Sequence, residues 1–362
     1  MQLAWLLVNA CAVLGIVAWV YRKFSLRGVG YARFFSKSEA FAGESIEMVE
    51  RIDNRKWLPL PWVRLESMIG QGLVFGAQTN LDIRGGETFQ NHISLFSLRP
   101  YRRIVRRHRV LCARRGYYRL ESATLTAGDP LGMARATRAF PLSLSLVVYP
   151  EPIPFRELPL PSHSWLGDVA VRRWIVEDPF LTSGTREYRP GDSLRSVNWK
   201  ATARAGRLQV HQRDYTADHR LMICVNLEVH EKMWNAVTEP ERIERALRYA
   251  ASVALYAAER GVETGLLTNG WTFGSPKRAV RLAPGGGAAH VQAMLTALAK
   301  LQLEIATGMD ALLEEELSSG AVDTDYLIIS CHRGEALLER AEALRRRGNG
   351  VEWMIVPEEG SA

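Results

Sequence analysis

The sequence LMICV (221–225), TEPERIERALRYAASVALYAAERG (238–261) and ETGLL (263–267) has the pattern of a strand, a helix and a second strand. The two short apolar runs are typical of buried parallel strands. In the middle segment apolar residues recur at helical spacing, a capping box over Thr238–Glu241 predicts the start of the helix, and Gly261 predicts its end. Such a unit is the building block of an α/β domain.

The rest of the C-terminal region repeats this alternation. Further strands are expected at 326–330 and 353–356, and further helices at 288–301, 309–317 and 335–346. We therefore predict a doubly wound α/β domain over residues 184–362, in which ligands would bind beyond the carboxyl ends of the strands.

A basic motif, GTREYRPGDSLRSVNWKATAR (184–204), opens this domain. The turn at Pro190-Gly191 and the N-cap types that follow it predict a short helix from Asp192 or Ser193 to Gly206, with Leu194, Val197 and Ala201 facing inward. Arg and Trp dominate interface hot spots, so the motif could be a docking surface. Alternatively its arginines pair internally with acidic residues or carbonyls. We expect Asp192 and Trp199 to be mainly structural and the outward arginines to contact a partner.

The motif resembles the signature of the bacterial domain of unknown function 58 family. The residues that carry this resemblance are Arg186, Tyr188, Gly191, Asp192, Arg195, Trp199 and Arg204. The resemblance implies a membrane protein with a β-rich front part and a C-terminal domain similar to the von Willebrand factor A fold. It also implies a MoxR-type AAA+ ATPase as partner and no established enzymatic activity.

In von Willebrand factor A domains a D-x-S-x-S motif after the first strand often holds a metal. Here Asn226, Glu228 and His230 occupy those positions, and Cys331-His332 stand where a further acidic ligand is expected. Magnesium prefers carboxylate and hydroxyl oxygens. We therefore expect a degenerate site that binds no metal, and no cofactor elsewhere.

The N-terminal segment LAWLLVNACAVLGIVAWVY (Leu3–Tyr21) is the one run long and apolar enough for a bilayer. As a helix it would span about 28 Å. Arg22 and Lys23 follow it, whereas a signal peptide carries its charge in front. We predict a single-pass anchor in the inner (plasma) membrane with the soluble domains in the cytoplasm.

Residues 28–150 show short apolar–polar alternations separated by turn signals, which predicts an antiparallel β-sandwich. The expected strands are 45–52, 62–68, 89–96, 105–112, 117–120 and 142–149. Leu58–Pro61 cannot be part of a central strand, because proline lacks a ladder donor. Five prolines between Pro150 and Pro161 predict a linker over 151–183.

Composition and charge restrict the class further. The 362 residues are 47% hydrophobic, which excludes a disordered chain, and the four cysteines form no CxxC pair. Residues 1–150 hold 21 Lys and Arg against 10 Asp and Glu, whereas residues 220–362 hold 15 against 20. The basic front half includes Arg102, Arg103, Arg106, Arg107 and Arg109. This cluster either faces anionic lipid headgroups or forms an ordinary solvated sheet face.

These observations favour a membrane-anchored, non-catalytic scaffold or adaptor. The resemblance implies the ATPase as its partner, and other membrane proteins of the same operon are further expected partners. A hydrolytic enzyme is an alternative, but no nucleophile and base converge in the sequence. A nucleic-acid-binding protein is another, but aromatic and basic residues are not interleaved and the chain is tethered.

Overall fold

The computed structural model describes residues 2–76, 81–85, 89–159, 177–188, 197–215, 220–231 and 237–358. The chain divides into two compact units, Met1–Glu151 and Pro152–Ala362. Each unit has its own sheets and its own core.

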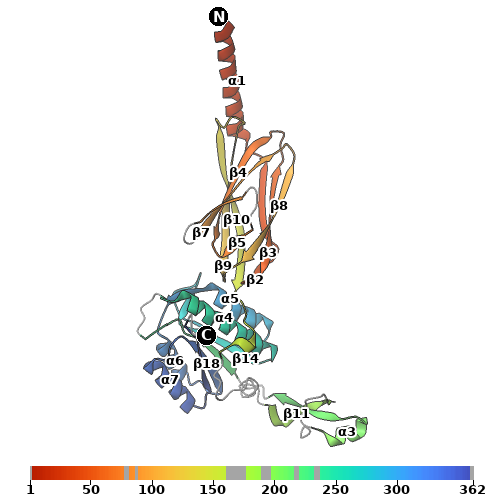
Figure 1. Cartoon of the computed structure of the whole chain (residues 1–362), viewed down its shortest axis with the longest axis vertical. Coiled ribbons are helices and arrows are strands. Elements are labelled where there is room, and N and C mark those ends of the chain that lie inside the picture. Colours follow the sequence, from red (N-terminus) through yellow and green to blue (C-terminus); the bar gives the residue numbers. More distant parts are fainter. Residues whose placement is uncertain are drawn as a thin grey trace. The chain divides into compact units, whose positions relative to one another are not determined.

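The first unit begins with α1 (Gln2–Phe24), drawn in red in Figure 1. The helix is long and apolar enough to cross a membrane. It extends past the predicted Leu3–Tyr21 because Arg22 and Lys23 form its last turn, where cations interact favourably with the helix dipole. Beyond it, Leu26 is buried in the core of the sandwich, so the chain passes from helix to sheet without a linker.

Two sheets follow, and the predicted β-sandwich is confirmed. One sheet has the order β1 (Val29–Phe35), β3 (Ser45–Asn54), β8 (Arg103–Cys112), β5 (Leu73–Phe75). The other has the order β2 (Glu39–Phe41), β10 (Arg135–Tyr149), β9 (Gly116–Gly128), β4 (Leu60–Gly70), β7 (Phe89–Leu98), β6 (Leu81–Gly85). All neighbours are antiparallel except β2 and β10. Apolar residues of both sheets form the core between them.

The prolines lie where the ladders are interrupted. Pro61 falls in β4 at the register shift between Leu60 and Val63, and Pro141 falls at the shift in β10 before Leu144. Proline cannot donate to a ladder, so each position tolerates it. The prediction that Leu58–Pro61 is excluded from a central strand therefore holds only up to Pro59, because β4 starts at Leu60 and lies between two strands.

The second unit contains a five-stranded sheet. Its order is β16 (Val280–Gly285), β14 (Glu263–Thr268), β13 (Arg220–Val225), β18 (Thr324–Ser330), β19 (Val351–Ile355). Four of these strands are parallel and β16 is antiparallel to β14. A short two-stranded sheet, β15 (Gly270–Thr272) with β17 (Leu301–Ile305), lies after β14.

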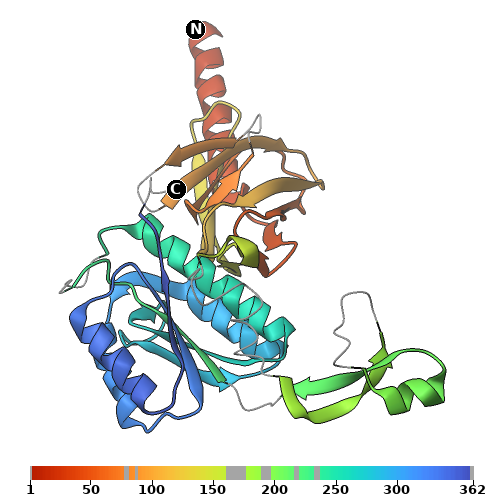
Figure 2. The same ribbon diagram turned by 60° about the horizontal axis from the view of Figure 1, so that its bottom comes forward.

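Helices cover both faces of this sheet, as Figure 2 shows. They are α4 (Pro240–Glu259), α5 (Ala288–Lys300), α6 (Met309–Ser318) and α7 (Glu335–Arg346). Side chains alternate along a strand, so Met222 and Cys224 pack with α6 and α7, while Leu221 and Ile223 face the other side and α4. The four parallel strands and the four helices agree with the predicted ranges to within three residues, whereas β15, β16 and β17 were not predicted. One detail is wrong: the N-cap of α4 is Glu239, not Thr238, because Pro240 takes the first helical position.

The basic motif lies in a hairpin. Strand β11 (Glu177–Glu187) pairs antiparallel with β12 (Gln209–Tyr215), and α3 (Trp199–Ala205) lies between them in the chain. The predicted end of the helix at Gly206 is confirmed, since Gly206 has φ +68° and its N–H donates to Thr202. The predicted inward position of Val197 on this helix is wrong. Val197 forms a β-bridge to Val210, and Asn198 caps the helix by accepting from the Ala201 N–H at 2.9 Å.

The predicted linker over 151–183 is described only at its two ends. Its first residues pack on α4: the Ile153 N–H donates to Ser252 Oγ at 2.7 Å, and the Phe155 ring stacks on Tyr256 with centroids 3.8 Å apart. Its last residues, from Glu177, already belong to β11. The first residues of the proline-rich segment are thus packed against α4 of the second unit.

Candidate functional site

The carboxyl edge of the parallel sheet carries a buried network of amides and a hydroxyl. Asn226, directly after β13, donates from Nδ2 to Ser330 Oγ at 3.1 Å and accepts at Oδ1 from Asn269 Nδ2 at 3.0 Å. Asn269 in turn accepts from the Leu227 N–H at 2.8 Å, and Ser330 Oγ donates to the His332 carbonyl at 2.7 Å. Three neighbouring strand ends are therefore joined by neutral groups that satisfy one another.

The loop after β13 also supplies two carboxylates that bind helix N-termini. Glu228 accepts from the Met309 N–H at the start of α6. Glu231 accepts from the Glu335 N–H at the start of α7 at 2.6 Å. Free N–H groups and the helix dipole favour a negative charge at both places. The loop thereby fixes the two helices to the edge of the sheet.

The two carboxylates differ in environment. Burial and the nearby charge of Asp310 raise the pKa of Glu228 to about 7, against the lowering effect of its hydrogen bonds. Glu231 is exposed. Glu228 is therefore the acid at this edge whose charge changes near neutral pH.

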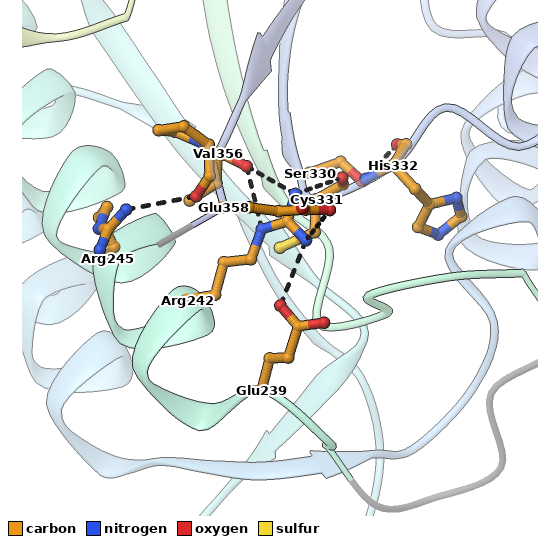
Figure 3. Close-up of polar contacts among 9 residues, drawn as sticks. Glu239, Arg242, Arg245, Ser330, Cys331, His332, Val356 and Glu358 are labelled. Atoms are coloured by element: carbon orange, nitrogen blue, oxygen red, sulfur yellow. Dashed lines mark hydrogen bonds and ion pairs between the residues drawn. The ribbon is translucent and has the colours of Figure 1, made fainter. Parts of the chain in front are cut away.

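Arg242, in the first turn of α4, is the one charge buried at this edge among the described residues. Its Nε and Nη2 donate to the Val356 carbonyl at 3.0 and 2.8 Å, and Nη2 also donates to the Cys331 carbonyl at 3.0 Å. Figure 3 shows the guanidinium between these carbonyls, with Glu239 on its outer side. Arg242 therefore ties α4 to the ends of β18 and β19.

The adjacent Cys331 and His332 are not arranged for covalent chemistry. Burial raises the pKa of the Cys331 thiol to about 11, so it is protonated at neutral pH. Burial also lowers the pKa of His332. In Figure 3 the His332 ring points away from the Arg242 cluster. No activated nucleophile results from this pair.

The positions predicted for a degenerate metal site are separated by the structure. Asn226 is bound within the amide network, Glu228 caps α6, and His230 is exposed. Within the described ranges, no three His, Cys, Asp or Glu side chains are arranged to hold a metal ion. The hydrogen-bonding groups of this edge serve to connect elements.

The residues of the basic motif lie in and next to the hairpin. Arg186 pairs through its backbone with Val210 in the β11–β12 ladder, and Tyr188 is half-buried. Trp199 is 67% exposed, contrary to the mainly structural role expected for it, and Arg204 is exposed on the same helix. Gly191, Asp192 and Arg195 lie outside the described residues.

The arginine cluster of the first unit is distributed along β8. Arg103 pairs with Asp53, Arg107 pairs with Glu47 at 3.6 Å, and Arg106 points inward toward Glu50 at 3.7 Å. Arg102 precedes the strand, and Arg109 is exposed farther along it. A ten-residue strand spans about 33 Å, so these side chains do not share one end of the sandwich.

Sequence reasoning missed a buried ionic network between the two sheets. Glu50 accepts from Arg33, from Tyr31 at 3.0 Å, and is bonded to His108 Nε2 at 3.0 Å; Arg33 also donates to Ser67 of the opposite sheet at 3.0 Å. Burial opposes ionisation, yet the bond to His108 and the charge of Arg33 lower the pKa of Glu50 to about 2. The available signal was a charged residue in register with the inward face of each strand.

Comparisons with known proteins cover the two units differently. Residues 184–348 match the family described as Protein of unknown function DUF58. Uncharacterized protein YeaD of Bacillus subtilis (strain 168) is 21% identical over 360 residues, which cover 99% of this chain and 83% of that protein. The family match includes the hairpin from Gly184 onward and all strands of the five-stranded sheet except β19.

Among solved structures, the similarity is confined to about a third of the chain. The full-length major pilin SpaD from Corynebacterium diphtheriae is 9% identical with a TM-score of 0.24, covering 31% of this chain and 34% of the pilin. A cohesin module from Clostridium perfringens is also 9% identical, with a TM-score of 0.20, covering 32% of this chain and 97% of the module.

Proposed function

We propose that this protein is a membrane-anchored, non-catalytic adaptor whose cytoplasmic α/β domain, similar to the von Willebrand factor A fold, binds a MoxR-type AAA+ ATPase. The observation that carries the proposal is the exposure of Trp199 beside cations on α3. The polar groups of the carboxyl edge, in contrast, are engaged with one another. The exposed tryptophan and cations of α3 are therefore better suited to binding a partner protein than the carboxyl edge is.

The α3 surface consists of Trp199, Lys200 and Arg204. Trp199 is 67% exposed, and both cations are exposed. Lys200 and Arg204 are four residues apart and so lie on one face of the helix, next to the indole. Trp and Arg are enriched in interface hot spots, because each buries a large area and makes directed contacts.

The helix is held firmly despite its seven residues. The Asn198 cap, the left-handed Gly206 and a bond from the Gln209 N–H to Thr202 Oγ at 3.0 Å fix both of its ends. The bridge between Val197 and Val210 connects it to the hairpin. A preorganised surface loses less side-chain and backbone entropy on binding.

The fold assignment and the orientation have separate support. Four parallel strands with an antiparallel edge strand and helices on both faces support the proposed similarity to the von Willebrand factor A fold. Arg22 and Lys23 form the last turn of α1 and Arg27 follows it, and positive residues favour the cytoplasmic side.

The α3 surface can be tested by capture of a purified MoxR-type ATPase on the detergent-solubilised full chain. Trp199→Ala and Arg204→Glu are each expected to weaken binding at least tenfold, the effect of losing a hot spot. Arg346→Glu, an equal charge change at the end of α7, is the matched control and is expected to leave binding unchanged. Equal capture by all variants would show that α3 is not the contact surface.

A further inference from the structure

The end of the sandwich from which α1 leaves is formed by three loops, residues 55–59, 99–102 and 129–134 (Figure 1). The base of the helix is bonded to the first loop: Lys56 Nζ donates to the Ser25 carbonyl at 2.6 Å, and the Arg55 N–H donates to the Gly28 carbonyl at 3.0 Å. If α1 crosses a bilayer, these loops lie at its surface.

Buried polar side chains hold the three loops in place. Asn54 Nδ2 donates to the carbonyls of Leu58 at 3.0 Å and Arg99 at 3.1 Å, which joins the first two loops. In the third loop, Asp129 accepts from the Leu131 N–H at 3.1 Å, and its carbonyl accepts from Trp62 Nε1 at 2.9 Å. The loop tips are therefore fixed.

Each loop presents a large apolar or aromatic side chain outward. Trp57 is 68% exposed, Tyr101 70%, Leu131 63% and Met133 64%. Single exposed apolar residues are common on soluble proteins, but these four lie at one end, on three loops around a single helix. Tryptophan and tyrosine favour the headgroup region of a bilayer.

The same end is strongly basic. Its exposed cations are Arg22, Lys23, Arg27, Arg55, Arg99 and Arg102. The only acid in the three loops is Asp129, which is 1% exposed and bonded to backbone N–H groups. Each basic residue close to an anionic membrane contributes about 1 kcal/mol to binding.

We propose that this end of the sandwich is a membrane-seating surface for anionic lipids. Trp57, Tyr101, Leu131 and Met133 lie among the headgroups, and the surrounding cations contact lipid phosphates. The inference rests on the proposed membrane anchor and adds to it that the sandwich is seated on the bilayer through its loops. The opposite end, around Gln71, is about 33 Å away along β4 and stays in water.

Nitroxide labels on the full chain in phosphatidylglycerol-containing vesicles test this surface. Single cysteines replace Trp57, Tyr101 or Met133 in a Cys11→Ala background, because the other three native cysteines are buried. Gln71→Cys is the control for water and Leu6→Cys the control for the bilayer interior. We expect labels at the three loop tips to collide several-fold more often with lipid-dissolved oxygen, relative to a water-soluble nickel chelate, than the label at Gln71.

The outcomes separate this inference from the anchor itself. Loop labels as open to the chelate as Gln71, with Leu6 in the acyl chains, would overturn the seating while the anchor stands. A water-exposed label at Leu6 would overturn both. Loop labels shielded from both reagents would show a covering protein instead of lipid. Arg99→Glu with Arg102→Glu is expected to reduce the immersion of the Trp57 label, and unchanged immersion would exclude a role for anionic lipid.

Discussion

The core of the sandwich and the carboxyl edge of the α/β sheet contain buried polar networks of different kinds. The sandwich buries an ionic network in which Glu50 faces Arg33 and His108. The α/β unit joins its strand ends through the neutral side chains of Asn226, Asn269 and Ser330. The ionic network depends on charge balance and leaves Arg33 Nε, Arg33 Nη1 and His108 Nδ1 without bonds, whereas the amide network depends on the direction of each donor.

This difference determines how much stability is lost when one side chain of each network is replaced. Removing one member of a buried ion pair leaves an uncompensated charge in a medium that solvates it poorly. Changing one member of a neutral network leaves a single unmet donor or acceptor, which costs less. Both networks connect separate secondary-structure elements, so a substitution in either one should lower the free energy of unfolding of its unit.

The largest effect is expected for Glu50→Gln. The substitution keeps the shape of the side chain but leaves Arg33 without its counter-ion, so the sandwich should lose about 3–5 kcal/mol at pH 7. Because the pKa of Glu50 in the folded state is lowered from 4.5 to about 2, its stabilisation is present above pH 4.5 and is lost as the pH falls toward 2. The difference between wild type and variant should therefore shrink over that range.

Hydrogen exchange of β3 and β8 peptides measures this loss within the full chain. The matched control is Glu47→Gln, a half-exposed carboxylate on the same strand that pairs with Arg107 at 3.6 Å. We expect the control to change stability by less than about 0.5 kcal/mol. Similar losses of stability in both variants would show that the buried Glu50–Arg33 pair contributes no more than the pair of Glu47 with Arg107.

Arg242→Met tests a buried charge that is balanced by dipoles and not by a buried carboxylate. It leaves the Val356 and Cys331 carbonyls without their donor, which should cost the α/β unit about 3 kcal/mol. The charge of Arg242 also helps to lower the pKa of the nearby His332, so the loss should be smaller at pH 5, where the variant protonates His332 more easily, than at pH 8. Thermal unfolding at both pH values measures it. Arg245→Met, which removes one bond to the Pro357 carbonyl, is the control with an expected cost of about 1 kcal/mol.

Asn226→Asp places an ionisable side chain in the neutral network of the α/β unit. A carboxylate oxygen cannot donate to Ser330 Oγ, which already donates to the His332 carbonyl, so we expect a loss of about 2 kcal/mol at pH 8. Burial raises the pKa of the new carboxyl, so the loss should shrink at low pH, where the protonated group can donate. Addition of Mg²⁺ during thermal unfolding is expected to leave the stability of the variant unchanged. Recovery of stability with the metal would show that this edge retains a cation site.

The four parallel strands and the four helices of the α/β unit were predictable, but β15, β16, β17 and the connecting side chains were not. Apolar runs at 221–225 and 326–330 and the helical spacing from 240 to 259 are local signals, and the structure reproduces them. Arg242 bonds residues 89 and 114 positions away, which no local pattern contains. A partial signal existed, since Arg242 is in helical register with the buried Ala246 and Tyr249.

In the sandwich and the hairpin, the failures have different causes. Strands β2 and β5 have three residues each, too short for an alternation to be recognised. In the hairpin, Asp192, Ser193 and Asn198 are all favoured N-cap types, so the sequence did not distinguish among them. The pairing of Val197 with Val210 across the hairpin excludes Val197 from the helix.

The smallest effects are expected for Glu228 and Glu231, the two carboxylates of the loop after β13. Glu228 has a folded-state pKa raised from 4.5 to about 7, so the folded state binds the proton more tightly than the unfolded state, and stability falls as the pH rises from 4.5 to 7. Glu228→Gln removes this loss while its carbonyl can still accept from Met309. The variant should therefore be more stable than wild type by about 1 kcal/mol at pH 8, after allowance for partial solvent screening, and equal to it at pH 4.

Glu231→Gln should have the opposite sign. The exposed carboxylate interacts with the N-terminus of α7, so its neutralisation should cost about 0.5 kcal/mol at pH 8. Thermal unfolding of both variants at pH 4 and pH 8 therefore distinguishes a carboxylate held near an acid from one placed to bind a helix. If Glu228→Gln also destabilised the protein at pH 8, the bond to Met309 would outweigh the cost of burial and the repulsion from Asp310, and the stability of this edge would depend on the Glu228 charge.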